Sequence, residues 1–171
     1  THDASIGYFQ SPLIESVLIV FMIAASLNFA RHFIAFRKMS IAPYVSDTEG
    51  KALLILLASS VLIVTVVLVA HNIYSSPLTA LRHAAFNVVS MASTTGFVSQ
   101  DFESWPTFAP IWMLFLACVT CSTGSTGGGI KMFRTLLLTR QARREMLLLV
   151  HPDAVAPVRI GGQIIPDRIA Y

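Results

Sequence analysis

Long apolar segments separated by short polar ones predict two membrane-crossing helices in the first part of the chain. Residues 12–30 (PLIESVLIVFMIAASLNFA) carry Glu15 as their one charge, and residues 53–70 (LLILLASSVLIVTVVLVA) carry none. About twenty such residues are needed for a helix to cross the hydrocarbon core of a bilayer. We therefore expect a continuous helix over each segment, with Glu15 at the membrane interface. The polar residues 39–52 between them predict a short connection.

The next helical pattern, at residues 76–93 (SPLTALRHAAFNVVSMAS), is too short and too polar to cross a membrane. Ser76 followed by proline is typical of a helix start. The helix should end in the uncharged turn 93–97 (STTGF), and the polar stretch 99–103 follows. This order predicts a re-entrant helix that enters the membrane, turns and leaves on the same side. Backbone of this kind is stable only where protein covers it or an aqueous path meets it.

A further apolar segment, residues 108–120, is interrupted by a glycine-rich run at 122–129 (STGSTGGG) and resumes at 130–138. Four glycines between positions 124 and 129 make a continuous helix unfavourable, because each costs about 1 kcal/mol relative to alanine. The sequence therefore predicts a span broken at this run. A gate on an ion path and a packing loop between close helices both remain open.

Basic residues gather at the same end of each predicted span. They are Arg31, His32, Arg37 and Lys38 after the first span, and Arg134, Arg140, Arg143 and Arg144 after the last one. Such clusters mark the cytoplasmic side. No Lys or Arg occurs between Lys51 and Arg82, so the intervening loop should face outward. With 54% hydrophobic and 12% charged residues, the chain has the composition of a membrane protein without a nucleic-acid footprint.

The turn at 93–97 has the chemistry of an ion-coordinating loop. The candidate cation ligands are the backbone carbonyls of Thr94, Thr95, Gly96 and Phe97. Neutral oxygens can replace the hydration shell of an alkali cation without holding it too tightly. A glycine allows the backbone to turn successive carbonyls toward one axis, and the carboxyl end of the preceding helix adds attraction for a cation. A plain tight turn between helices is the alternative.

The residues of the candidate gate are Gly124, Ser125, Thr126, Gly127, Gly128, Gly129 and Lys131. The sequence disfavours a nucleotide-binding P-loop, because its motif requires lysine directly after glycine and then Ser or Thr. Lys131 is expected to extend to the cytoplasmic interface, or alternatively to face the ion path. Arg82 and His83 are interpreted as structural or outward-facing. No metal-ligand spacing or catalytic triad indicates an enzyme.

The acidic residues after the turn and the cysteines before the glycine-rich run carry weaker signals. Asp101 and Glu103 are interpreted as acids of a solvated loop, or alternatively as groups that concentrate cations at the outer side. Cys118 and Cys121 form a lone C-x-x-C inside an apolar stretch, which favours reduced packing cysteines.

The turn at 93–97, followed by the run 121–131 (CSTGSTGGGIK), resembles the Trk/Ktr/HKT superfamily of potassium-uptake proteins, and most of all the membrane subunit of the bacterial Trk system. In that family four span-loop-span repeats of one polypeptide surround one pore. The resemblance implies that Gly96 is the filter glycine and that 122–129 is an intramembrane gating loop. It also implies a bacterial inner-membrane protein that moves K⁺ without a cofactor, forms a homodimer and binds a cytosolic nucleotide-binding regulatory subunit.

The expected fold is therefore an all-α membrane protein with a span, re-entrant pore helix and span, as in potassium channels, preceded by one extra transmembrane helix. Residues 1–38 would hold the last helix of a preceding repeat, 39–52 a cytoplasmic linker and 53–150 one whole repeat. Residues 151–171 would form a cytoplasmic connection with a small hairpin, leading to a following repeat. Two alternatives are a small channel subunit that assembles as a homotetramer and a membrane interaction subunit that transports nothing.

Overall fold

The computed structural model describes residues 5–151, 159–160 and 163–164. Its helices are η1 (Ser5–Phe9), α1 (Pro12–Ser26), α2 (Phe29–Lys38), α3 (Ala42–Val45), α4 (Thr48–Ala70), α5 (Pro77–Ala92), α6 (Phe108–Val119) and α7 (Met132–Val150). Two short strands, β1 (Arg159–Ile160) and β2 (Gln163–Ile164), pair antiparallel, as the predicted hairpin requires. The described residues are otherwise helical or irregular, which confirms the expected all-α class.

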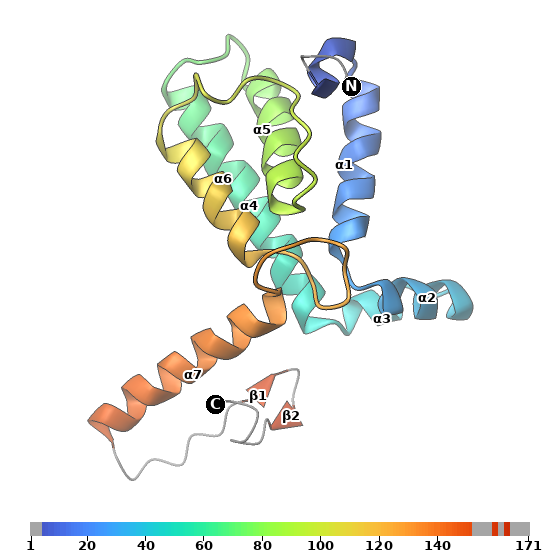
Figure 1. Ribbon diagram of the computed structural model, residues 1–171, viewed down its shortest axis with the longest axis vertical. Helices are drawn as coiled ribbons and strands as arrows, with labels where there is room; N and C mark the ends of the chain where they lie inside the picture. The colour runs from blue at the N-terminus through green and yellow to red at the C-terminus, as the bar shows by residue number, and fades with distance from the viewer. Residues whose placement is uncertain (1–4, 152–158, 161–162, 165–171) are drawn as a thin grey trace.

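Helix α5 is the centre of the helical body and packs against α1, α4 and α6 (Figure 1). Its small residues Ala80, Ala84 and Val88 recur every fourth position, so they share one face and allow close approach of the neighbouring helices. The main core comprises these residues together with Leu53, Leu57, Val64 and Leu68 of α4 and Ala109, Met113 and Leu116 of α6. On another face, Phe86 and Val89 pack against Met22 of α1.

The continuous helix expected over residues 12–30 is wrong. Helix α1 ends at Ser26, α2 begins at Phe29, and the two axes differ by 102°. The break is stable because Asn28 caps the new helix, with its side-chain oxygen accepting a hydrogen bond from Ala30 N–H at 2.8 Å. Helix α2 consequently runs sideways from the lower end of α1 (Figure 1).

The second predicted span is longer than expected. Helix α4 begins at Thr48, inside the segment predicted to be a linker, because Asp47 caps it by accepting a hydrogen bond from Glu49 N–H at 3.2 Å. Among the described residues, α4 is the one helix long and apolar enough to cross a membrane by itself. The bent pair of α1 and α2 meets the same criterion only if it is counted as a single span.

The predicted helix at 76–93 is confirmed as α5, with Ser76 capping it and Pro77 in its first turn. After α5 the chain reverses and runs back to the upper end of the helix before α6 begins (Figure 1). Helix α6 stops at Val119, close to the predicted break. Helix α7 does not continue the axis of α6 but leaves the body obliquely (Figure 1), unlike the resumed span expected at 130–138.

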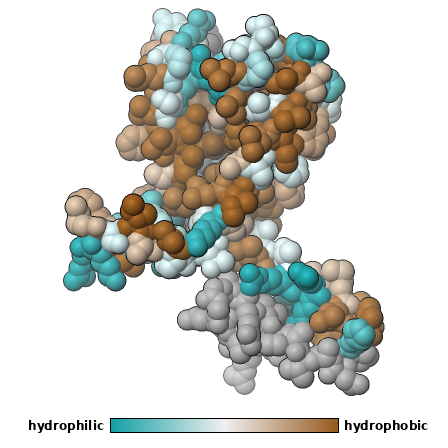
Figure 2. Space-filling view, turned by 180° about the vertical axis from the view of Figure 1, so that it is seen from behind, coloured by the Kyte–Doolittle hydropathy of each residue, from teal (hydrophilic) through white to brown (hydrophobic). Residues whose placement is uncertain are grey.

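Apolar side chains cover much of the outer surface of the helical body (Figure 2). They include Leu13, Val20 and Phe21 of α1, Ile55, Leu62 and Val66 of α4, and Ile111 and Leu114 of α6. Hydrophilic side chains gather instead at the upper end of the body, at the tip of the sideways-projecting segment and on the lower part of the molecule (Figure 2). An apolar surface of this extent is suited to contact with lipid or further protein.

An ion pair between the buried Glu15 and the half-buried Arg82 joins α1 to α5. Arg82 donates from Nε to Glu15 Oε2 at 2.6 Å and from Nη2 to Glu15 Oε1 at 2.7 Å. Glu15 is only 2% exposed, so the carboxylate is covered by protein. Its position at the membrane interface stays a prediction. Arg82 has the structural role expected of it, and its planar fork matches the carboxylate in a way that lysine cannot reproduce.

Removal of either partner of this pair should destabilise the protein. We expect Arg82→Ala to cost about 3 kcal/mol, because it leaves the carboxylate of Glu15 buried and unpaired. Glu15→Ala should cost less, because the Arg82 side chain is 30% exposed and can be hydrated. The measurement is thermal unfolding of the full-length protein in detergent for both single variants and the double variant. The double variant should lose much less than the sum of the single losses, and strictly additive losses would show that the two side chains are not coupled.

Candidate functional site

The turn that follows α5 has the backbone geometry expected of a glycine-dependent loop. Thr94 and Gly96 both have positive φ, +57° and +77°. In the described part of the chain, a Cβ on Gly96 would meet nothing within 4 Å. Glycine is therefore needed here for its left-handed backbone and not for lack of room. Thr94, Thr95 and Gly96 are all exposed.

The turn is folded back onto the end of α5. The carbonyl of Ser90 accepts hydrogen bonds from Thr95 N–H at 2.9 Å and Gly96 N–H at 3.4 Å, and Met91 accepts one from Thr94 N–H at 3.0 Å. The hydroxyls of Ser93 and Thr95 are 2.8 Å apart. These contacts place the turn at the carboxyl end of α5, where the helix dipole is negative.

Asn87 holds the segment that leaves the turn. Its side-chain oxygen accepts a hydrogen bond from Ser99 N–H at 3.0 Å, and its amide donates to the carbonyl of Gln100 at 3.0 Å. Asn87 is 1% exposed, so both bonds are shielded from competing water. The returning segment is thereby fastened along the helix that precedes it.

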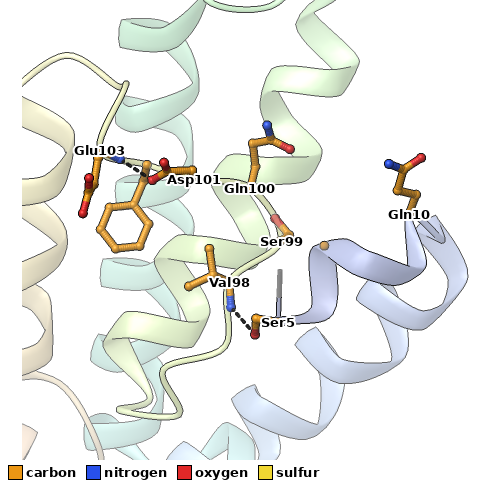
Figure 3. A pocket seen from close by; sticks show the side chains of 9 residues that line it. Ser5, Gln10, Val98, Ser99, Gln100, Asp101 and Glu103 are labelled. Atoms are coloured by element: carbon orange, nitrogen blue, oxygen red, sulfur yellow. Dashed lines mark hydrogen bonds between the residues drawn. The ribbon is translucent and has the colours of Figure 1, made fainter. Parts of the chain in front are cut away.

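The returning segment also contacts η1 and borders a cavity of about 580 Å³ (Figure 3). Val98 N–H donates to Ser5 Oγ at 3.2 Å, and Gly7 N–H donates to the carbonyl of Val98 at 3.1 Å. Asp101 and Glu103 line one side of this cavity, away from Gln10 on the other side (Figure 3). Whether these acids concentrate cations stays a prediction.

The glycine-rich run forms a loop whose two ends are joined. Ile130 N–H donates to the carbonyl of Cys118 at 2.7 Å, and Met132 N–H donates to the carbonyl of Cys121 at 2.8 Å. Gly129 has φ +75°, and a Cβ there would lie 2.7 Å from the carbonyl oxygen of Ala117. The loop thus closes on the end of α6, and it pairs the carbonyl of Cys118 in the last turn of that helix.

The loop lies against the break between α1 and α2. Ser122 N–H donates to the carbonyl of Ser26 at 2.9 Å, and Phe29 N–H donates to the carbonyl of Gly124 at 3.2 Å. A Cβ on Gly124 would lie 3.3 Å from the side-chain oxygen of Asn28. Backbone groups that the interrupted helix cannot pair internally are therefore paired by the loop.

The loop also touches the turn. Gly128 N–H donates to Thr94 Oγ1 at 2.9 Å, and a Cβ on Gly127 would lie 3.3 Å from the carbonyl oxygen of Ser93. The buried Cys121 lies between them and directs its Sγ to the carbonyl of Ala92 at 3.5 Å. The two segments singled out in the sequence are thus in direct contact.

Lys131 does not extend away to an interface, contrary to the favoured interpretation of the sequence. Its ammonium group donates to the carbonyls of Ser125 and Gly127 inside the glycine-rich loop. The side chain is half-buried and bridges across the loop that precedes it. The positive charge of Lys131 therefore lies against two carbonyl oxygens of the candidate gate.

Three polar residues that support these segments were not predicted to do so: Asn28, Glu49 and Asn87. Asn28 and Asn87 carry a usable signal, because an amide inside an apolar helical stretch needs a partner. Glu49 carries none, since an acid in a polar connection is ordinary. Its contact with the glycine-rich loop depends on how α4 is packed.

Comparison with known proteins decides the family. A family model described as "TrkH: Cation transport protein" matches residues 1–171. The chain belongs to the TrkH family of cation transport proteins. The potassium-uptake resemblance carried by the glycine-rich run is thereby confirmed, and the family is one of transport proteins and not of enzymes.

Curated relatives align with nearly the whole chain. The chain is 43% identical over 169 residues to "Trk system potassium uptake protein TrkH" of Salmonella typhimurium, which covers 99% of the chain and 35% of that protein. It is 36% identical over 169 residues to "Trk system potassium uptake protein TrkG" of Escherichia coli, with the same coverage. The chain thus spans about one third of the length of these relatives.

The fold also matches a solved member of the TrkH family. The crystal structure of the potassium transporter TrkH from Vibrio parahaemolyticus aligns with a TM-score of 0.94 and 39% sequence identity. The alignment covers 99% of this chain and 36% of that one. The arrangement of helices described above is therefore the arrangement of the corresponding part of a potassium transporter.

Two neighbouring glycines allow a matched test of how the loop is packed. A Cβ on Gly127 would lie 2.0 Å from Cys121 Sγ, whereas a Cβ on Gly128 would meet only the Thr94 side chain, at 3.8 Å. We expect Gly127→Ala to lower stability by about 1–3 kcal/mol through overpacking, and Gly128→Ala to change it little. Thermal unfolding of both full-length variants measures the difference. Equal losses would contradict the described packing of Gly127 on Cys121.

Proposed function

We propose that this chain is the part of a bacterial inner-membrane potassium transport protein that contributes one side of the ion pathway and its gate. The observation that carries the proposal is the contact between Gly128 of the glycine-rich loop and Thr94 of the turn after α5. A backbone-lined turn and a flexible loop in contact can filter an ion and then block it. The potassium-uptake names of the relatives support the same substrate.

In this proposal, the carbonyls of residues 94–97 form one side of the filter. The exposure of Thr94, Thr95 and Gly96 in this chain leaves them available to an ion and to the other sides of a pore. Carbonyl oxygens compensate K⁺ for its lost water molecules, and the carboxyl end of α5 adds a favourable potential. Release remains rapid because no carboxylate belongs to the turn.

The gate is the glycine-rich loop together with Lys131. Hydrogen bonds from the Lys131 ammonium group to Ser125 and Gly127 fill carbonyls that would otherwise attract a passing cation. The loop thus obstructs the path sterically and places a fixed positive charge on it. Displacement of the loop removes both obstacles together.

The rest of the pore is assigned to further repeats of the same polypeptide. Residues 53–150 would form one span, re-entrant helix and broken span, with 1–38 closing the preceding repeat, 39–52 linking the two, and 151–171 leading onward. The greater length of the relatives favours this arrangement over a tetramer of short chains, and their names disfavour a subunit without transport. The proposal includes an outward-facing filter, cytoplasmic basic segments, a homodimer and a cytosolic nucleotide-binding partner.

Substitution of Gly96 in the full-length protein tests the filter. A left-handed backbone costs a residue with a Cβ about 1–2 kcal/mol, so Gly96→Ala should reduce potassium uptake and Gly96→Val should nearly abolish it. Uptake and the preference for K⁺ over Na⁺ are measured in cells deficient in potassium uptake, at matched membrane levels of protein. Normal uptake and preference in Gly96→Val would contradict the filter role.

Deletion of residues 124–129 tests the gate. Shortening the loop removes the obstruction, so the variant should take up potassium faster than the parent protein, or constitutively. Growth at low external potassium and initial uptake rates provide the measurement. Unchanged uptake by a correctly inserted variant would reject the gate while leaving the filter proposal standing.

A further inference from the structure

Glu49 connects the start of α4 to both ends of the glycine-rich loop. One carboxylate oxygen, Oε1, accepts a hydrogen bond from Thr123 N–H at 2.6 Å and another from Phe133 N–H at 3.0 Å. Thr123 lies where the chain enters the loop, and Phe133 lies in the first turn of α7, just after the chain leaves it. A single side chain thus connects the segment that enters the loop with the segment that leaves it.

The helix that carries Glu49 is a firm support. Asp47, two residues before Glu49, caps α4 and lies 3.9 Å from Arg31. Leu53 and Leu57 anchor the helix in the core. A Cβ on Gly50 would lie 3.0 Å from Asp47 Oδ2 and 3.4 Å from a methyl of Leu27, so this end of α4 is closely packed. Glu49 therefore projects from a fixed element toward a loop rich in glycine.

The hydrogen bonds to Glu49 differ in kind from the others that join the loop to the rest of the protein. The Lys131 ammonium group also makes charge-assisted bonds to the loop, but from the segment that directly follows it. The contacts with Ser26, Phe29 and Thr94 join neutral groups. A carboxylate that accepts from backbone N–H groups makes charge-assisted bonds, which are about twice as strong as neutral ones. Both bonds to Glu49 fall at the base of the loop, where a small opening would move the whole loop.

We propose that Glu49 is a positioning residue that holds the glycine-rich loop in its closed place, an inference that rests on the proposed gating role of the loop. Glu49 touches no ion in this scheme. It acts by stabilising the arrangement in which Gly128 contacts Thr94 and Gly127 covers Cys121. When the carboxylate is lost, the N–H groups of Thr123 and Phe133 lose their partner, and the displaced loop becomes more populated.

Two substitutions separate the positioning role from a general need for a side chain. Glu49→Gln keeps an oxygen that can accept both hydrogen bonds but removes the charge, whereas Glu49→Ala removes the acceptor. Lys51→Ala is the matched control, because it removes an exposed charge two residues further along the same helix. The fraction of protein with a displaced loop should be lowest in the parent and in Lys51→Ala, which should be equal. It should be higher in Glu49→Gln and highest in Glu49→Ala.

Cys121 reports the position of the loop without any reference to transport. Its side chain is 0% exposed, and Gly127 lies directly over its Sγ. The experiment uses the full-length protein with Cys118→Ser and with all other cysteines outside this stretch replaced. A charged methanethiosulfonate is applied to both membrane faces, and the modification rate of Cys121 is followed by mass change.

Glu49→Ala should raise the modification rate of Cys121 about tenfold, as the loss of a charge-assisted bond implies, with Glu49→Gln between it and the parent. An unchanged rate in Glu49→Ala, or an equal increase in Lys51→Ala, would overturn the inference. Elution of each variant as a single sharp peak in size-exclusion chromatography checks that it is folded.

Potassium uptake then separates this inference from the proposed function. Glu49→Ala should raise potassium uptake in the protein with an intact loop. Combined with the 124–129 deletion it should raise uptake no further, because the loop that Glu49 holds is then absent. If the deletion raises uptake but Glu49→Ala does not raise the modification rate of Cys121, the positioning role of Glu49 is contradicted and the proposed gate stands. If Glu49→Ala exposes Cys121 while neither change alters uptake, Glu49 holds the loop but the loop is not a gate.

Discussion

The structure depends on pairing backbone polar groups at places where helices are interrupted inside an apolar body. Away from water, an unpaired N–H or carbonyl costs several kcal/mol. Here the loop after α6 pairs with both of the other interruptions: Ser122 with Ser26 and Gly124 with Phe29 at the break after α1, and Gly128 with Thr94 at the turn after α5. The loop therefore stabilises the break and the turn, and they stabilise it.

Helix α5 organises the surroundings of these interruptions through two kinds of residue. Its alanine face brings α4 and α6 close, which delivers the end of α6 and the glycine-rich loop to the same level as the turn. Its polar residues Arg82 and Asn87 fasten α1 on one side and the returning segment on another. A short helix thereby fixes the position of segments that are remote in sequence.

Local patterns predicted the elements that local chemistry determines. Ser76-Pro77 marked the start of α5, Gly96 marked a left-handed turn, and the glycine run marked the end of α6. Sequence periodicity could not predict the 102° bend after Ser26, because an apolar segment satisfies its own backbone in a straight helix unless distant groups are available. The same holds for Lys131 and Glu49, whose partners are backbone groups that no residue pattern encodes.

The pairing between Ser26 and Ser122 has a consequence for biogenesis. The carbonyl of Ser26 is synthesised about a hundred residues before the amide that it accepts from. Until the later segment arrives, continuation of the helix past Ser26 is the least costly way to pair that carbonyl within a bilayer. We therefore expect the nascent segment at the translocon to be a straight apolar helix over residues 12–30, and its bend to form only after the chain up to Ser122 has been synthesised.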